Sequence, residues 1–211
     1  EAVKDNFKNK YGDRPPMLFA MGDGNHSLAT AKANWEKLKE TLSPAQRQDH
    51  PARYALVEVE NIHDEGIVFE PIHRVVFGMD GTCGVEYLTA KLAEQNGGCD
   101  FVNCASREDM ERKAAAEAPG AHILPTTFRQ GWGYFRVTAP AAQLAVGTLQ
   151  NAIDAMLRDV KGASVDYIHG DAVTIELGQK PGNMGFLLPP MAKSAFFDTV
   201  IFDGALPRKT F

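Results

Sequence analysis

The chain has 211 residues and a formal net charge of −5, with 44% hydrophobic and 23% charged residues. This composition is typical of a globular protein and excludes a disordered or fibrous chain. A chain of this size buries enough apolar surface to fold without disulfide or metal staples. The acidic balance argues against nonspecific nucleic-acid binding, which needs a surplus of lysine and arginine.

The lengths of the apolar runs and the number of cysteines indicate where in the cell the protein is expected. Runs such as 185–188 and 195–197 fall far short of the ~20 residues that a membrane helix needs, so no membrane segment is predicted. No secretory signal pattern is visible either. Three cysteines without a Cys-x-x-Cys pair favour free thiols in a reducing cytoplasm over a catalytic cysteine. We therefore expect a cytoplasmic protein, and the oligomeric state is left open.

The N-terminal part shows a strand, loop and helix pattern. A polar helix should end near residue 10, and the apolar run 17–21 lies between Pro-Pro and Gly-Asp-Gly, which suits a buried strand. Apolar residues at helical spacing then predict a helix over 27–41. Alternation predicts strands over 54–60 and 67–77, the second interrupted by Pro71.

The rest of the chain alternates between element types. Helices are expected over 85–95, 107–117, 141–160 and 191–200, and strands over 100–103, 121–125, 131–138, 165–169 and 184–188. Helical crossovers and a hairpin together predict an α+β fold with a mixed sheet. The chain is expected to form a single domain, or two subdomains that divide near residue 80.

The sharpest candidate site is the loop of Gly22, Asp23, Gly24, Asn25, His26 and Ser27. Its glycines permit tight turns, and Ser27 or Asn25 could cap the following helix. Because the first amides of a helix lack acceptors, they attract an anion. His26 could bind phosphate or move a proton, and Asp23 could also move a proton. The Walker and dinucleotide-binding glycine patterns are both missing, and an ordinary strained turn is the alternative reading.

The residues 20–31, 71–74, 167–169 and 206–211 closely resemble the uncharacterised bacterial family numbered 1015 among the domains of unknown function. This resemblance implies that the chain is the C-terminal portion of a longer protein. Members usually carry Asp-Gly-His-His-Arg where this chain has Asp23-Gly24-Asn25-His26-Ser27. That form is distantly similar to the Gly-x-His-Arg signature of the ParB and sulfiredoxin superfamily, which includes a free serine kinase. This distant similarity implies that the loop forms a ParB/sulfiredoxin-like element and binds a phosphate group.

Two further groups of residues are candidates for ligand contacts. In the first, His73 and Arg74 point to opposite faces of a regular strand, and Arg74 could bind phosphate bidentately or form a buried ion pair. In the second, His169 and Asp171 lie where a strand ends, so Asp171 could act as a base or hold a metal while His169 orients substrate. A helix start capped by Asp171 is the alternative.

Two functions remain open from the sequence. The first is an enzyme that acts on a phosphorylated small molecule or nucleotide, with Asp23, His26 and Asp171 as catalytic candidates. Phosphoryl transfer involving serine or phosphoserine is implied only by the distant kinase resemblance, and Mg²⁺ held by Asp23 or Asp171 would accompany it. The second is a noncatalytic small-molecule or nucleotide-binding module, favoured by the missing arginine and by Asn25 in place of histidine.

Overall fold

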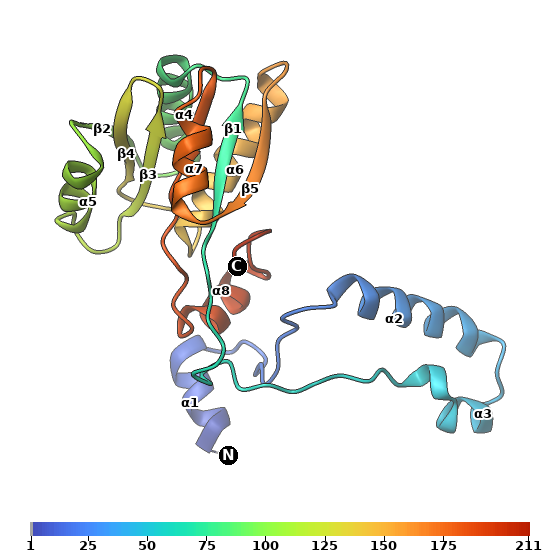
Figure 1. Ribbon diagram of the computed structural model, residues 1–211. Helices are drawn as coiled ribbons and strands as arrows, with labels where there is room; N and C mark the ends of the chain where they lie inside the picture. The colour runs from blue at the N-terminus through green and yellow to red at the C-terminus, as the bar shows by residue number, and fades with distance from the viewer. Residues whose placement is uncertain (1) are drawn as a thin grey trace. The chain divides into compact units, whose positions relative to one another are not determined.

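The computed structural model describes residues 2–211, with side chains from Asp5 onward. The chain forms two compact units, Glu1–Asp64 and Glu65–Phe211, which are drawn in Figure 1. The boundary between them therefore falls before the position near residue 80 that the sequence suggested.

The N-terminal unit is helical and has little buried surface. It contains α1 (Ala2–Tyr11), α2 (Asn25–Glu40), α3 (Pro44–Asp49) and the short 3₁₀ helix η1 (Pro51–Arg53). The start of α3 is fixed by a capping box between Ser43 and Gln46. No residue of α2 or α3 is fully buried, and the apolar Trp35 and Leu38 of α2 are only half-buried.

The strands predicted over 17–21 and 54–60 are wrong. Both segments are extended, but neither belongs to a β-ladder within the described residues. A strand is stable only when its main-chain groups pair with a neighbouring strand, and alternation along a sequence does not supply that neighbour. The strand predicted over 67–77 is shortened to Ile72–Phe77, since Pro71 has no N–H to donate to the sheet.

The C-terminal unit contains a six-stranded sheet in the order β2-β4-β3-β6-β1-β5. The strands are β1 (Ile72–Phe77), β2 (Cys99–Cys104), β3 (His122–Phe128), β4 (Gly131–Val137), β5 (Ser164–His169) and β6 (Asn183–Phe186). The α+β class is confirmed. The predicted mixture of strand directions is wrong, because every neighbouring pair is antiparallel. The crossover from β5 to β6 spans β1, which lies antiparallel between them.

Helices cover both faces of this sheet. Figure 1 shows α7 (Asp171–Gly178) in front of the strands, with α4 (Gly81–Gln95) and α6 (Ala145–Asp159) behind them. The larger core lies between the sheet and the rear helices, and it includes Val76, Leu88, Leu92, Leu149, Ile153 and Phe186. Each such side chain contributes roughly 1.5–3 kcal/mol by leaving water. A smaller core of Met110, Tyr134 and Leu187 includes a residue of α5 (Arg107–Ala115).

Helix α7 packs against β6 almost backbone to backbone. A Cβ added at Gly178 would lie 2.5 Å from the amide nitrogen of Gly185. The two glycines therefore set the depth at which α7 sits on the sheet, and with it the position of Asp171 at the start of the helix. The last helix, α8 (Ala195–Asp203), precedes the C-terminal segment. No helix in the described part of the chain combines the length and apolarity that crossing a bilayer would need.

Candidate functional site

The predicted loop at residues 22–27 leads directly into α2 and is exposed throughout. Gly24 is the residue before the helix, with φ 74° in the left-handed region that favours glycine. Its N–H donates to Oδ1 of Asp23 over 2.7 Å, which fixes the turn locally. Capping by Ser27 or Asn25 is wrong, since both lie inside the first turn of α2, and the helix has no side-chain cap.

The first turn of α2 consequently presents main-chain donors to solvent. The first intrahelical bond runs from the N–H of Leu28 to the carbonyl of Gly24 over 2.9 Å. The three amides before it, Asn25 to Ser27, precede the helical ladder and have no acceptor four residues earlier inside the helix. No acidic residue lies in this turn itself, and the carboxylate of Asp23, two residues before the helix, accepts from Gly24.

His73 of β1 lies in the C-terminal unit and is almost completely buried, with 2% of its surface exposed. Its Nδ1 accepts the N–H of Leu188 over 3.0 Å, so its proton must lie on Nε2. Nε2 then donates to Oδ1 of Asp171 over 2.9 Å. Burial lowers the pKa of His73, and the opposing influence of Asp171 is smaller. The ring is therefore neutral near pH 7, and both of its nitrogens are occupied.

Asp171 is the first residue of α7, after Gly170, so the alternative of an Asp171 cap is not what the structure shows. Its second oxygen accepts from Nη2 of Arg107, at 2.5 Å. Arg107 opens α5 and also donates from Nε to Glu111, at 2.7 Å. Sequence reasoning missed Arg107, which lies 64 residues from Asp171 and has no motif around it. His169 ends β5 nearby and is exposed.

The chemistry of this second group is that of a closed hydrogen-bonded network. Asp171 accepts hydrogen bonds from His73 and Arg107, and His73 has no lone pair left to accept a substrate proton. A general base needs a free lone pair within reach of the proton that it removes. The structure thus joins His73 and Asp171, as the sequence did not foresee, in an arrangement that positions the start of α7.

Arg74 points to the opposite face of the sheet and is fully buried. Its Nη2 donates to the carbonyls of Arg208 and Lys209, at 2.9 and 2.8 Å, and its Nη1 to the carbonyl of Ile72. Its Nε donates to Oε1 of Gln150 over 3.3 Å. The predicted alternative of an ion pair with a carboxylate is not observed. The buried guanidinium donates its hydrogen bonds to acceptors of the protein itself, so Arg74 does not bind phosphate together with the 22–27 loop as the sequence suggested.

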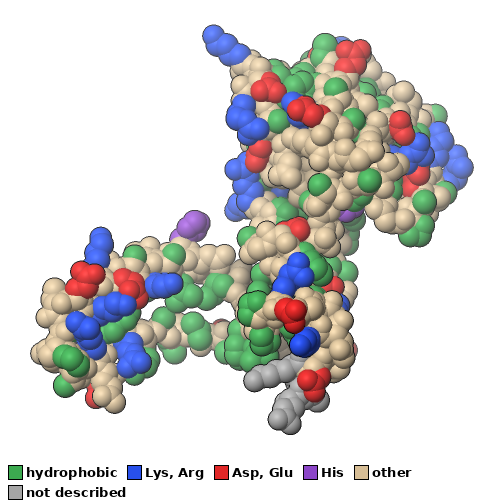
Figure 2. All heavy atoms as spheres, turned by 180° about the vertical axis from the view of Figure 1, so that it is seen from behind, with side chains coloured by type: hydrophobic (Ala, Val, Ile, Leu, Met, Phe, Trp, Pro, Cys, Tyr) green, Lys and Arg blue, Asp and Glu red, His purple; other side chains and the backbone are tan. Residues whose placement is uncertain are grey.

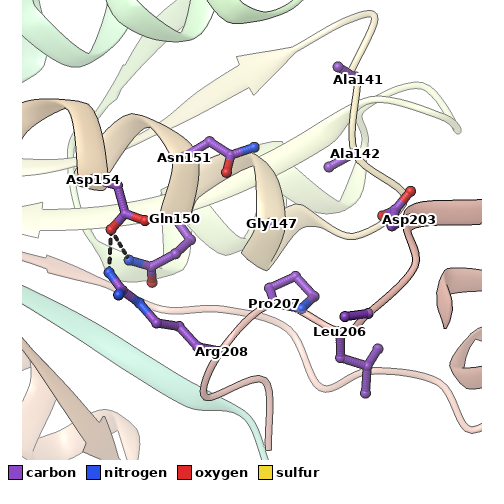
Figure 3. A pocket seen from close by; sticks show the side chains of 11 residues that line it. Ala141, Ala142, Gly147, Gln150, Asn151, Asp154, Asp203, Leu206, Pro207 and Arg208 are labelled. Carbon is purple, nitrogen blue, oxygen red and sulfur yellow. Dashed lines mark hydrogen bonds and ion pairs between the residues drawn. The ribbon is translucent and has the colours of Figure 1, made fainter. Parts of the chain in front are cut away.

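The C-terminal segment that Arg74 holds also borders a cavity of about 600 Å³. Figure 3 shows the early turns of α6 on one side and the segment around Pro207 on the other. The cavity has the size of a small-molecule site. However, Asp154 on its wall already accepts from Arg208 and from Gln150, the latter at 2.8 Å. Asp154 and Arg208 therefore pair with each other instead of facing a ligand.

The acidic side chains do not gather into a metal centre. Asp23 belongs to the N-terminal unit and Asp171 to the C-terminal unit. Within the residues that the structure describes, no three histidine, cysteine or acidic side chains group so that they could hold a metal ion. A Mg²⁺ ion at either aspartate would therefore need oxygens from a bound ligand to complete its shell.

The model of the family described as "Protein of unknown function (DUF1015)" matches residues 2–156. The chain belongs to this family. The matched region of this DUF1015 protein contains the 22–27 loop and β1, and it ends before His169 and Asp171. No curated protein and no solved structure matches the chain. The family resemblance seen in the sequence is thereby confirmed, and the ParB/sulfiredoxin likeness of the loop stays a prediction.

Proposed function

We propose that this DUF1015 protein binds the phosphate group of a small molecule or nucleotide at the loop that opens α2. The observation that carries the proposal is the first turn of α2, which is exposed and has neither a side-chain cap nor an acidic residue. A helix start of this kind is favourable for a phosphate, because main-chain donors and the helix dipole act together. Gly22 and Gly24 let the chain approach the ligand closely.

Three polar side chains supplement the amides. Asn25, His26 and Ser27 occupy the first three positions of α2, all exposed, and each offers a donor to an anion. The sequence supports the same reading, since the loop resembles a phosphate-gripping signature in which a histidine occupies the place of His26. Binding here would depend on hydrogen bonds and dipoles, since the arginine usual in the family is replaced by Ser27.

The geometry favours binding without turnover. Asp23 is tied to the N–H of Gly24, and both oxygens of Asp171 are engaged in the other unit. Phosphoryl transfer is the second candidate, favoured by one observation. His26 is exposed at the helix start and makes no hydrogen bond or ion pair with the described part of the chain, so its imidazole is available to move a proton. In that case a nucleotide with Mg²⁺ would be the phosphoryl donor.

Calorimetric titration with inorganic phosphate, pyrophosphate, phosphoserine and ATP tests the binding site. Asn25→Asp adds one negative charge to the first turn without changing side-chain size. Asn34→Asp makes the same change in the middle of α2, away from the donors. We expect Asn25→Asp to weaken phosphate binding about tenfold through charge repulsion at close range. Asn34→Asp should leave affinity nearly unchanged, and equal effects of the two variants would refute the site.

A separate measurement distinguishes the two functions. Phosphorus NMR of ATP with serine and Mg²⁺ follows any loss of the γ-phosphate in the presence of the chain. Binding without turnover predicts an unchanged spectrum over hours. Turnover that His26→Gln abolishes, with ATP still bound, would establish the enzyme instead. Absence of both binding and turnover in a folded chain contradicts both functions.

A further inference from the structure

The N-terminal unit contains two extended segments whose apolar side chains face solvent. In the segment before α2, Leu18 is 66% and Phe19 73% exposed. In the segment after η1, the exposed apolar side chains are Tyr54 65%, Leu56 103%, Val57 56% and Val59 70%. Figure 2 shows apolar side chains along the extended chain that leads to and from α2 and α3. Such a concentration of apolar surface marks an interaction site.

The segment 54–60 has the composition and backbone of a strand. It alternates, contains β-branched valines, and runs extended from the end of η1 to the turn at Asn61. No residue from Ala55 to Glu60 makes a main-chain hydrogen bond to another described residue. A row of unpaired N–H and C=O groups beside apolar side chains is a template for another strand.

We propose that this segment pairs antiparallel with the same segment of a second copy of the chain, about a twofold axis at Val57. A twofold contact uses the same surface on both copies. In this register Val57 faces its own counterpart, Ala55 faces Val59, and one face of the two-stranded ribbon is entirely apolar. On the other face Leu56 lies opposite Glu58, and Tyr54 lies opposite Glu60.

Charge excludes the registers whose axis lies nearer the C-terminal end of the segment, and length disfavours an axis at Leu56, which would pair only residues 54–58 of the segment. An axis at Glu58 would place two carboxylates directly opposite each other, and an axis at Val59 would place Glu58 opposite Glu60. Like charges directly opposite each other across strands are destabilising. An axis at Val57 avoids both contacts and pairs every residue from 54 to 60. It is also the midpoint of the exposed strand-like stretch, so it closes the largest number of main-chain bonds.

Disulfide trapping in the full chain tests the register. All variants carry Cys83→Ser, because Cys83 is an exposed free thiol. Val57→Cys brings two cysteines opposite each other, within the roughly 4.5–5.5 Å that separates facing residues. Val59→Cys is the matched control: it is the same residue type on the same face and is more exposed, 70% against 56%. Its two copies would lie about 14 Å apart along the strands, too far to bridge.

We expect covalent dimer from Val57→Cys at least tenfold faster than from Val59→Cys. Sedimentation should show a concentration-dependent dimer that Val57→Lys abolishes by opposing two ammonium groups. Val173→Lys, at an exposed valine of the C-terminal unit, should leave the dimer intact. Leu56→Lys should also preserve it, because the new lysine faces Glu58. A monomer at every concentration, or equal trapping at positions 57 and 59, would overturn the proposal.

Discussion

Replacing Arg74 with methionine should release the C-terminal segment. The guanidinium donates four hydrogen bonds, two of them to the carbonyls of Arg208 and Lys209, and lies 5.0 Å from the ring centre of Tyr167. Burial is the main cause that lowers the pKa of Arg74 to about 10, a net penalty on its charged form of roughly 3 kcal/mol. Hydrogen bonds from a charged donor contribute about 1.5 kcal/mol or more each. Arg74→Met should therefore lower the free energy of unfolding by roughly 3 kcal/mol.

Two measurements test the effect of Arg74→Met on stability and on the C-terminal segment, and a second variant serves as the control. Urea denaturation gives the free energy of unfolding, and hydrogen exchange by mass spectrometry reports opening of residues 204–211. Arg136→Met makes the same replacement at an arginine whose side chain is 35% exposed and pairs with Asp100 and Glu117, and should cost about 1 kcal/mol. Equal losses of stability in the two variants, or unchanged exchange of the C-terminal segment in Arg74→Met, would show that Arg74 does not hold this segment.

Three further predictions concern the C-terminal unit. Burial lowers the pKa of His73 and of His122, so below about pH 6.5 the unfolded chain binds more protons than the folded chain. Urea denaturation should therefore give a constant free energy of unfolding above about pH 7 and a falling one below about pH 6.5. A flat profile down to pH 5 would contradict this. His73→Phe leaves the buried N–H of Leu188 without its acceptor and should lower the free energy of unfolding, measured in urea, by about 1–3 kcal/mol. Asp171→Asn changes a half-exposed ion pair and should lower it by less than about 1 kcal/mol. A larger loss from Asp171→Asn than from His73→Phe would refute the network described. Gly178→Ala forces α7 off β6 and should lower the melting temperature by several degrees, a result that an unchanged melting curve would disprove.

Periodicity predicted the helices well, because an amphipathic pattern is a local property of the chain. The helix expected over 27–41 is α2, and the hairpin expected over 121–138 is formed by β3 and β4. Strand pairing is not local, so the same kind of pattern failed at 17–21 and 54–60, where no ladder forms in the described residues. Strand direction failed for the same reason, since nothing near β5 in sequence indicates that β1 separates it from β6.

The candidate site residues also divide into those that a local sequence pattern indicates and those whose role depends on contacts far apart in the sequence. The loop from Gly22 to Ser27 stays a predicted site, and it stands out in the sequence because glycines and polar residues cluster within six positions. Arg107 was missed because its contact with Asp171 exists only once α5 and α7 cover one face of the sheet. Arg74 was misread, since a buried arginine and a ligand-binding arginine look alike in sequence. Only the carbonyls of Arg208 and Lys209, more than 130 residues away, reveal its role.

Amide NMR during a titration with inorganic phosphate shows whether the first turn of α2 binds phosphate. Binding at this turn predicts saturable shifts that are largest for the amides of Asn25, His26 and Ser27 and that disappear in Asn25→Asp. Chloride at the same ionic strength serves as the control for general salt effects. Shifts that match those with chloride, or that centre on another part of the chain, would contradict the claim.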